Sequence, residues 1–168
     1  MTGNKNKVMH HENDVNEWEK ADELADKIAL ALEGDSFINA YIAASIRLRE
    51  AARLVGFTAE ALKIFNSTFF NLCVTKEQRD AKKTSVSKKN VLANQIDVVD
   101  VADNIAEQCR PYDSKITLFA LSEIIVYSIS RGQFSNRDLK ILDELVLEVE
   151  ENIYSVMAMD NKMMEGKN

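Results

Sequence analysis

Apolar residues recur along most of this chain at steps of three and four positions, the spacing that places side chains on one face of an α-helix. The five glycines and the single proline fall between these segments or in the tails, whereas alanine, leucine, glutamate and lysine fill the segments. Helix-breaking residues confined to segment boundaries favour an all-α fold. Six main helices are predicted, at about 13–33, 37–55, 58–74, 91–110, 114–130 and 136–165.

One stretch without apolar periodicity separates the third predicted helix from the fourth. Residues 79–90 contain five basic residues and one acid, a composition typical of a mobile, exposed linker. We therefore predict a single bundle-like domain over 13–165, in which two three-helix halves share one core and the fourth and fifth helices lie at its centre. In chain order the expected parts are a polar tail at 1–12, a helical half at 13–78, the linker at 79–90, a helical half at 91–165 and a tail at 166–168.

Local signals mark several helix ends. Thr75 and Gln78 have the spacing of a capping box, and so do Ser135 and Asp138, with aspartate in place of the usual glutamate. Phe134 stands where a hydrophobic staple would contact the first turn of the last helix. Gly132 is expected to close the helix before it.

The overall composition is that of an ordinary globular protein. The chain has 168 residues, of which 46% are hydrophobic and 29% charged, enough to bury a core in one domain. Its formal net charge of −6 favours solubility and opposes a general attraction to nucleic acid. Cys73 and Cys109 are interpreted as buried, reduced thiols, although the sequence leaves a disulfide between them open.

Few residues offer catalytic or metal chemistry. The only histidines, His10 and His11, lie in the polar tail, and the sequence contains no glycine-rich phosphate loop and no Cys-x-x-Cys pair. The most apolar stretch, residues 116–129, is too short to span a bilayer and contains Glu123. We therefore expect no catalytic residue, no metal, no cofactor and no membrane contact, and we expect a cytoplasmic location.

Residues 48–67 have the spacing of a helix-turn-helix. Ala52 would permit a close helix crossing, Gly56 the turn, and Leu62 the apolar contact that holds the second helix. A DNA-binding regulator is therefore the first alternative function, although it is not favoured, because the second helix offers one lysine and Glu60 would repel phosphate. The residues expected to contact DNA under this alternative are Arg47, Arg49, Arg53, Thr58, Lys63, Asn66, Ser67, Lys82, Lys83, Lys88 and Lys89.

Four carboxylates lie three or four positions apart on the fourth predicted helix: Asp97, Asp100, Asp103 and Glu107. Carboxylates at this spacing can hold Mg²⁺ when a second helix supplies facing acids, so a magnesium-dependent, nucleotide-processing enzyme is the second alternative. The facing acids would come from the last helix: Glu144, Glu148 and Glu151. We favour the simpler interpretation, in which the four acids form the solvated face opposite an apolar stripe.

The last predicted helix carries a seven-residue apolar repeat and a methionine-rich end. Every bundle helix needs a core stripe, but the length of this one also suits an exposed seam for a partner or a second copy of the chain. The function we favour is a non-enzymatic interaction or regulatory protein that binds a protein partner and self-associates, as a homodimer, through this seam or the widely apolar fourth helix. The residues assigned to the interface are Val146, Val149, Ile153, Val156, Met157, Met163 and Met164.

Overall fold

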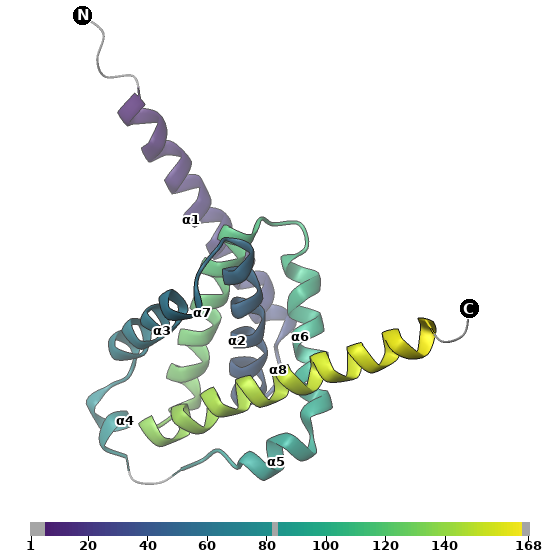
Figure 1. Ribbon diagram of the computed structural model, residues 1–168. Coiled ribbons are helices and arrows are strands. Elements are labelled where there is room, and N and C mark those ends of the chain that lie inside the picture. The colour runs from purple at the N-terminus through teal and green to yellow at the C-terminus, as the bar shows by residue number, and fades with distance from the viewer. Residues whose placement is uncertain (1–5, 82–83, 166–168) are drawn as a thin grey trace, which may run out of the picture.

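A computed structural model gives the arrangement of the helices (Figure 1). It describes the backbone of residues 6–81 and 84–165, and the side chains within these ranges except those of residues 6–14, 66, 69–73 and 158–165. All regular secondary structure in the described residues is helical. The helices are α1 (Asn6–Ala31), α2 (Phe37–Leu54), α3 (Ala59–Cys73), α4 (Lys76–Asp80), α5 (Lys88–Ala93), α6 (Gln95–Cys109), α7 (Ser114–Gly132) and α8 (Asn136–Glu165).

The all-α prediction is confirmed, but the described residues form eight helices where six main helices were predicted. α4 is a short helix that begins at the predicted capping box, in which Thr75 and Gln78 exchange side-chain and backbone hydrogen bonds. The prediction of one helix over 91–110 is wrong, because Asn94 takes a non-helical backbone, with φ −118° and ψ 29°, between α5 and α6. This break allows α5 to pack on α8, with Val91 buried.

α2 occupies the centre of the body and packs on α7, α6 and α8 (Figure 1). Small side chains let neighbouring helices approach on several sides. The five alanines of α2 are all buried: Ala40, Ala43, Ala44, Ala51 and Ala52. α1 packs on α7 and α6, so the helices of the first predicted half lie mainly against helices of the second half and share one core with them.

The end of α7 differs from the prediction that Gly132 closes it. Gly132 is the last helical residue, and the left-handed position belongs to Gln133, whose φ is 50°. A Cβ atom on Gly132 would stand 2.6 Å from the Phe134 ring. That ring is buried and contacts Tyr41 edge to face. Glycine is therefore needed here for close packing, and not for its backbone freedom.

Residues 84–86, inside the predicted mobile linker, are fixed to the start of α8. Asp138 is 2% exposed, and its carboxylate accepts hydrogen bonds from the backbone amides of Ser85 and Val86 at 2.7 and 3.1 Å. The same carboxylate completes the predicted capping box, accepting from the Ser135 amide at 2.9 Å and the Ser135 hydroxyl at 2.8 Å. The linker prediction is wrong for this part, because one carboxylate serves as both helix cap and loop anchor, and Val86 is buried.

The two terminal helices extend beyond the body. The first turns of α1 and the end of α8 lead away from the packed helices in different directions (Figure 1), although Ile153 and Tyr154 of α8 still contact the body. The first half of α8 packs on α2, α4 and α5. In the ranges that the structure describes, every helix is too short or too polar to cross a lipid bilayer.

Candidate functional site

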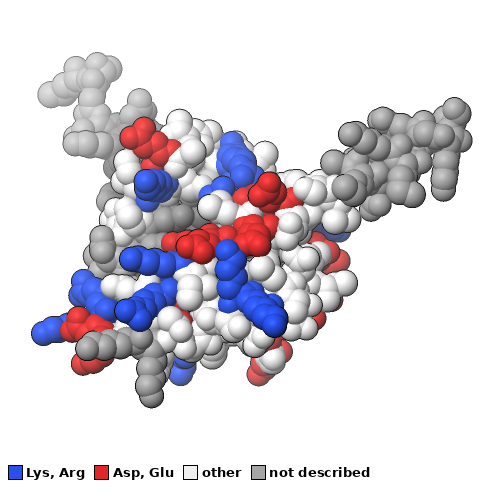
Figure 2. Space-filling model, turned by 60° about the horizontal axis from the view of Figure 1, so that its bottom comes forward, with Lys and Arg blue, Asp and Glu red and all other residues white. Residues whose placement is uncertain are grey.

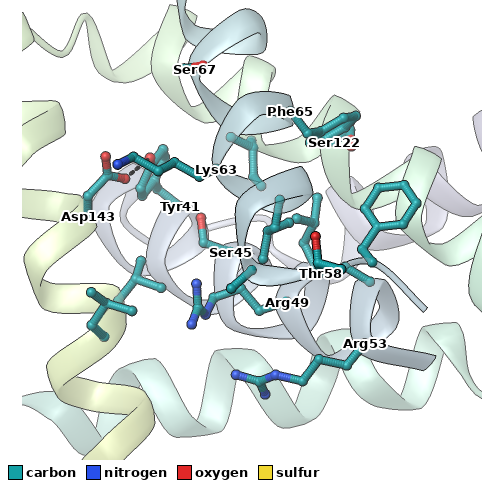
Figure 3. A pocket seen from close by; sticks show the side chains of 18 residues that line it. Tyr41, Ser45, Arg49, Arg53, Thr58, Lys63, Phe65, Ser67, Ser122 and Asp143 are labelled. Atoms are coloured by element: carbon teal, nitrogen blue, oxygen red, sulfur yellow. Dashed lines mark hydrogen bonds between the residues drawn. The ribbon is translucent and has the colours of Figure 1, made fainter. Parts of the chain in front are cut away.

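The candidate site is a pocket of about 540 Å³ between α2, α3, α7 and the first half of α8 (Figure 3). We call it the α2–α3–α8 pocket. Its apolar lining consists of Leu48, Ala52, Phe57, Ala59, Leu62, Phe65, Ile125, Val146 and Leu147. Phe57 and Leu147 are 39% and 52% exposed, so the pocket has apolar side chains open to solvent. A hollow of this size with mainly apolar walls is typical of a binding site.

The turn between α2 and α3 sets one side of this pocket. Gly56 has φ +82°, a left-handed conformation that suits glycine, and the Phe57 amide donates to the Ala52 carbonyl at 2.9 Å. Thr58 then caps α3, because its hydroxyl accepts a hydrogen bond from the Ala61 amide at 3.1 Å. The helix-turn-helix spacing thus locates a sharply turned helix pair, a geometry that by itself does not imply a DNA ligand.

A tyrosine–aspartate pair ties α2 to α8 within the pocket. The Tyr41 hydroxyl donates a hydrogen bond to the Asp143 carboxylate at 2.9 Å (Figure 3). Burial raises the pKa of Tyr41 well above its ordinary value of 10.0, and the charge of Asp143 raises it further. Burial also raises the pKa of Asp143, and the hydrogen bond from Tyr41 opposes that shift. Tyr41 therefore stays a neutral donor.

Two α2 arginines that line the pocket converge on one buried glutamate of α8. Glu150 is 5% exposed, accepts a hydrogen bond from Arg49 Nε at 2.8 Å and lies 2.9 Å from an Arg53 Nη atom. Arg47 reaches α6 instead, where its guanidinium lies 2.9 Å from the Asp103 carboxylate. Figure 3 shows Arg49 and Arg53 extending from α2 beside the pocket. These ion pairs join helices and partly neutralise the α2 arginines.

The other residues predicted to contact DNA are spread over several elements. Lys63 and Ser67 line the pocket, and Thr58 is the cap of α3. Lys88 holds α5 against α8, with its ammonium 2.9 Å from the Glu148 carboxylate. Lys89 is exposed. The Asn66 side chain, Lys82 and Lys83 lie outside the described residues.

The charges on one face of the molecule are mixed. In the view of Figure 2, acidic side chains gather near the centre, with lysines and arginines around them. DNA-binding proteins usually present a continuous basic patch, because phosphate contacts supply much of the affinity. This face therefore does not offer the electrostatic footprint expected of a DNA-binding surface.

The acidic row of the second alternative does not form a cluster with the last helix. Asp97, Asp100 and Glu107 are exposed, and Asp103 contacts Arg47. Glu144 and Glu148 of α8 both contact Lys88, not acids of α6. Within residues 15–65 and the other stretches whose side chains are described, no three His, Cys, Asp or Glu side chains lie close enough to hold a metal ion.

The residues assigned to a partner interface divide into two groups along α8. Val146 and Val149 are 5% and 0% exposed, so their assignment to an interface is wrong: they belong to the core of the chain itself. Ile153 is half-buried, and Val156 and Met157 are 58% and 57% exposed. The side chains of Met163 and Met164 lie outside the described residues.

Cys109 is a free, half-buried thiol. Burial raises its pKa to about 11, so the thiol stays protonated and unreactive near neutral pH. The side chain of Cys73 is outside the described residues.

Sequence reasoning missed Asp143 and Glu150 as site residues. Asp143 directly follows the core residue Leu142, and Glu150 directly follows the core residue Val149. The two acids are therefore seven positions apart, beside the core stripe of α8. Arginines four positions apart on α2 would face such acids if the two helices crossed there. The spacing of these arginines and acids was the signal available in the sequence, but using it requires knowing that α2 crosses α8.

A group of acids joins α1 to α7 outside the pocket. Partial burial raises the pKa of Glu123 to about 7, and a hydrogen bond with Asp22 and the charges of Asp22 and Asp26 add to the shift. The folded chain therefore holds a proton that the unfolded chain releases near the ordinary pKa of 4.5.

We expect this proton to make stability fall as pH rises. Protonated Glu123 stabilises the folded state below pH 4.5, and the contribution is lost as pH passes about 7. Glu123→Gln should flatten this part of the pH profile and be more stable than the unchanged protein above that window. Urea unfolding at several pH values measures the difference, with Glu19→Gln, an exposed acid of α1, as the control. Parallel pH profiles for Glu123→Gln and the unchanged protein would contradict this expectation.

Comparison with protein-family models, with curated proteins and with solved structures found no match for this chain.

Proposed function

We propose that this chain is a non-enzymatic interaction protein that self-associates through the second half of α8. The observation that carries the proposal is the course of the apolar stripe on α8. Leu142, Leu145 and Val149 are fully buried in the body. Val156 and Met157, about two turns further along the helix, are 58% and 57% exposed.

An apolar stripe that leaves the body favours a protein cover. Helices draw most of their stability from packing, and an isolated segment of about 15 residues is marginal in water. Covering the exposed 58% and 57% of Val156 and Met157 in an interface would contribute roughly 1 to 2 kcal/mol for each side chain. A second copy of the chain is the simplest source of cover, because most soluble oligomers are symmetric homo-oligomers.

The ion pairs of α2 give more support to this function than to DNA binding. Arg49 and Arg53 contact Glu150, and Arg47 contacts Glu50 and Asp103. A phosphate would have to compete with these carboxylates, on a chain whose formal net charge is −6. DNA binding by residues 48–67 therefore stays a prediction without support from these contacts.

Light scattering after size exclusion tests the proposal. We expect a mass of twice 19.0 kDa for the unchanged protein, decreasing on dilution. The double variant Val156→Glu with Met157→Glu places two carboxylates on the exposed stripe. It should raise the dissociation constant of the dimer at least about tenfold, which equals roughly 1.4 kcal/mol.

The matched control is Leu30→Glu, the same kind of change at a side chain of α1 that is 72% exposed. This variant should keep the mass of the unchanged protein. Circular dichroism should give the same helix content for all three proteins. A monomeric mass for the unchanged protein at every concentration, or an unaltered dissociation constant for the double variant, would refute the proposed function.

A further inference from the structure

We infer that the second half of α8 of one copy docks in the α2–α3–α8 pocket of a second copy, and that the two copies exchange this contact reciprocally. The inference rests on the proposed self-association and names the surface that receives the helix. Three observations carry it: matching apolar groups, opposite charges and the straight course of α8.

The pocket and the second half of α8 each have apolar side chains that the chain itself leaves uncovered. Phe57 and Leu147 of the pocket are 39% and 52% exposed, although Leu48, which lines the same pocket, is 2% exposed. Val156 and Met157 of α8 are exposed to a similar degree. Placing an amphipathic helix in an apolar groove is a common recognition mode, and methionine adapts well to irregular walls.

The charges of the two surfaces are complementary. Lys63 is exposed on α3, and the Arg53 side chain is 50% exposed beside the pocket even though it contacts Glu150. The sequence of residues 151–165 contains three acids and one lysine. Opposite charges at the rim of an interface favour the correct partner and orientation. Two basic side chains at one edge of an apolar pocket therefore suit an acidic, apolar helix such as this one.

The geometry of α8 requires that the contact be made between copies. α8 is one continuous helix from Asn136 to Glu165, and its first half forms a wall of the pocket through Asp143, Val146 and Leu147. Met157 lies ten positions beyond Leu147, about 15 Å further along the axis. The second half of α8 leads away from the body in Figure 1, so it cannot enter its own pocket.

A reciprocal contact closes the assembly as a two-fold dimer. In such an interface the same surface is used by both copies, so a contact from Met157 to Leu147 is matched by one from Leu147 to Met157. The two α8 helices would then run antiparallel past each other, and the assembly would stop at two copies. This arrangement predicts which positions of the two chains come close together.

Cysteine cross-linking of the full chain tests this arrangement. In a background with Cys73→Ser and Cys109→Ser, one preparation carries Leu147→Cys and a second carries Met157→Cys. The two are mixed and treated with a short bis-maleimide. We expect a covalent dimer between the two chain types, because position 147 of one copy lies beside position 157 of the other, and little product from either preparation alone.

The outcomes separate this inference from the proposed function. A dimeric mass together with cross-links mainly between two copies of Met157→Cys, or with no cross-link at all, would overturn the docking but leave the self-association intact. A monomeric mass would overturn both.

A second measurement uses Leu147→Glu, which places a negative charge on the pocket wall, where it would repel the acidic residues of the docked helix. It should raise the dissociation constant at least about tenfold. An unchanged constant, equal to that of Leu30→Glu, would overturn the docking.

Discussion

Asp138→Asn is expected to lower the free energy of unfolding by about 3 kcal/mol. The carboxylate of Asp138 is 2% exposed and accepts hydrogen bonds from the backbone amides of Ser85, Val86 and Ser135 and from the Ser135 hydroxyl. An asparagine has one acceptor oxygen, and its NH₂ group would face donors. At least one buried amide would therefore lose its partner, and the loop of residues 84–86 would lose its anchor on α8.

Urea unfolding followed by circular dichroism at one low protein concentration measures this loss. Asp113→Asn is the matched control, because Asp113 caps α7 at an exposed site and asparagine is an equally good cap. It should change stability by no more than a few tenths of a kcal/mol. Equal losses of unfolding free energy in the two variants would show that Asp138 only caps α8 and does not anchor the loop.

The stability difference between the unchanged protein and Asp138→Asn should also depend on pH, which gives an independent check. Burial by itself raises the pKa of Asp138, but the hydrogen bonds from Ser135, Ser85 and Val86 outweigh burial, so the pKa lies below its ordinary value of 3.8. The ionised carboxylate therefore stabilises the folded state above pH 3.8, and this contribution is lost as pH falls through the lowered pKa. The stability gap between the unchanged protein and Asp138→Asn should close in that acid range.

Glu150→Ala is expected to cost roughly 2 to 3 kcal/mol. The Glu150 side chain is 7% exposed and lies between Arg49 and Arg53, whose side chains are 25% and 50% exposed. Its removal leaves Arg49 largely shielded from water without its carboxylate and opens a gap between α2 and α8. Glu150→Gln fills the same volume and retains one acceptor oxygen, so its loss should be smaller.

Chemical denaturation of the three proteins measures these differences. Glu23→Ala is the control, because Glu23 and Lys27 form an ion pair whose side chains are 59% and 48% exposed. Exposed pairs of this kind contribute little, since water and salt screen them. A Glu150→Ala protein as stable as Glu23→Ala would mean that the α2 arginines need no carboxylate partner.

Local sequence signals were accurate where a few neighbouring residues decide the structure. The capping boxes at Thr75 and Ser135 formed as predicted, since their hydrogen bonds join residues three positions apart. Most helix boundaries followed from the same short-range spacing, but the predicted start near residue 13 is wrong, because α1 begins at Asn6 within the predicted polar tail. The break at Asn94 was missed, because the apolar pattern runs through it and only packing of α5 on α8 favours a new direction there.

The candidate site depended on contacts that no local pattern contains. Tyr41 and Asp143 are 102 positions apart, and Arg49 and Glu150 are 101 positions apart. Val149 and Val156 belong to the same apolar stripe of α8, but Val149 is buried and Val156 is exposed. The difference depends on how far along α8 the other helices pack against it.

The sequence by itself determined an all-α chain, most helix ends and the apolar stripe of α8, because these follow from backbone hydrogen bonding and side-chain period within a few residues. The tertiary structure alone decided that Gly132 is needed for the Phe134 ring, that Asp138 anchors the linker and that α2, α3, α7 and α8 enclose a pocket. The physical reason is that burial and ion pairing are set by the relative positions of whole helices, which short-range spacing does not specify.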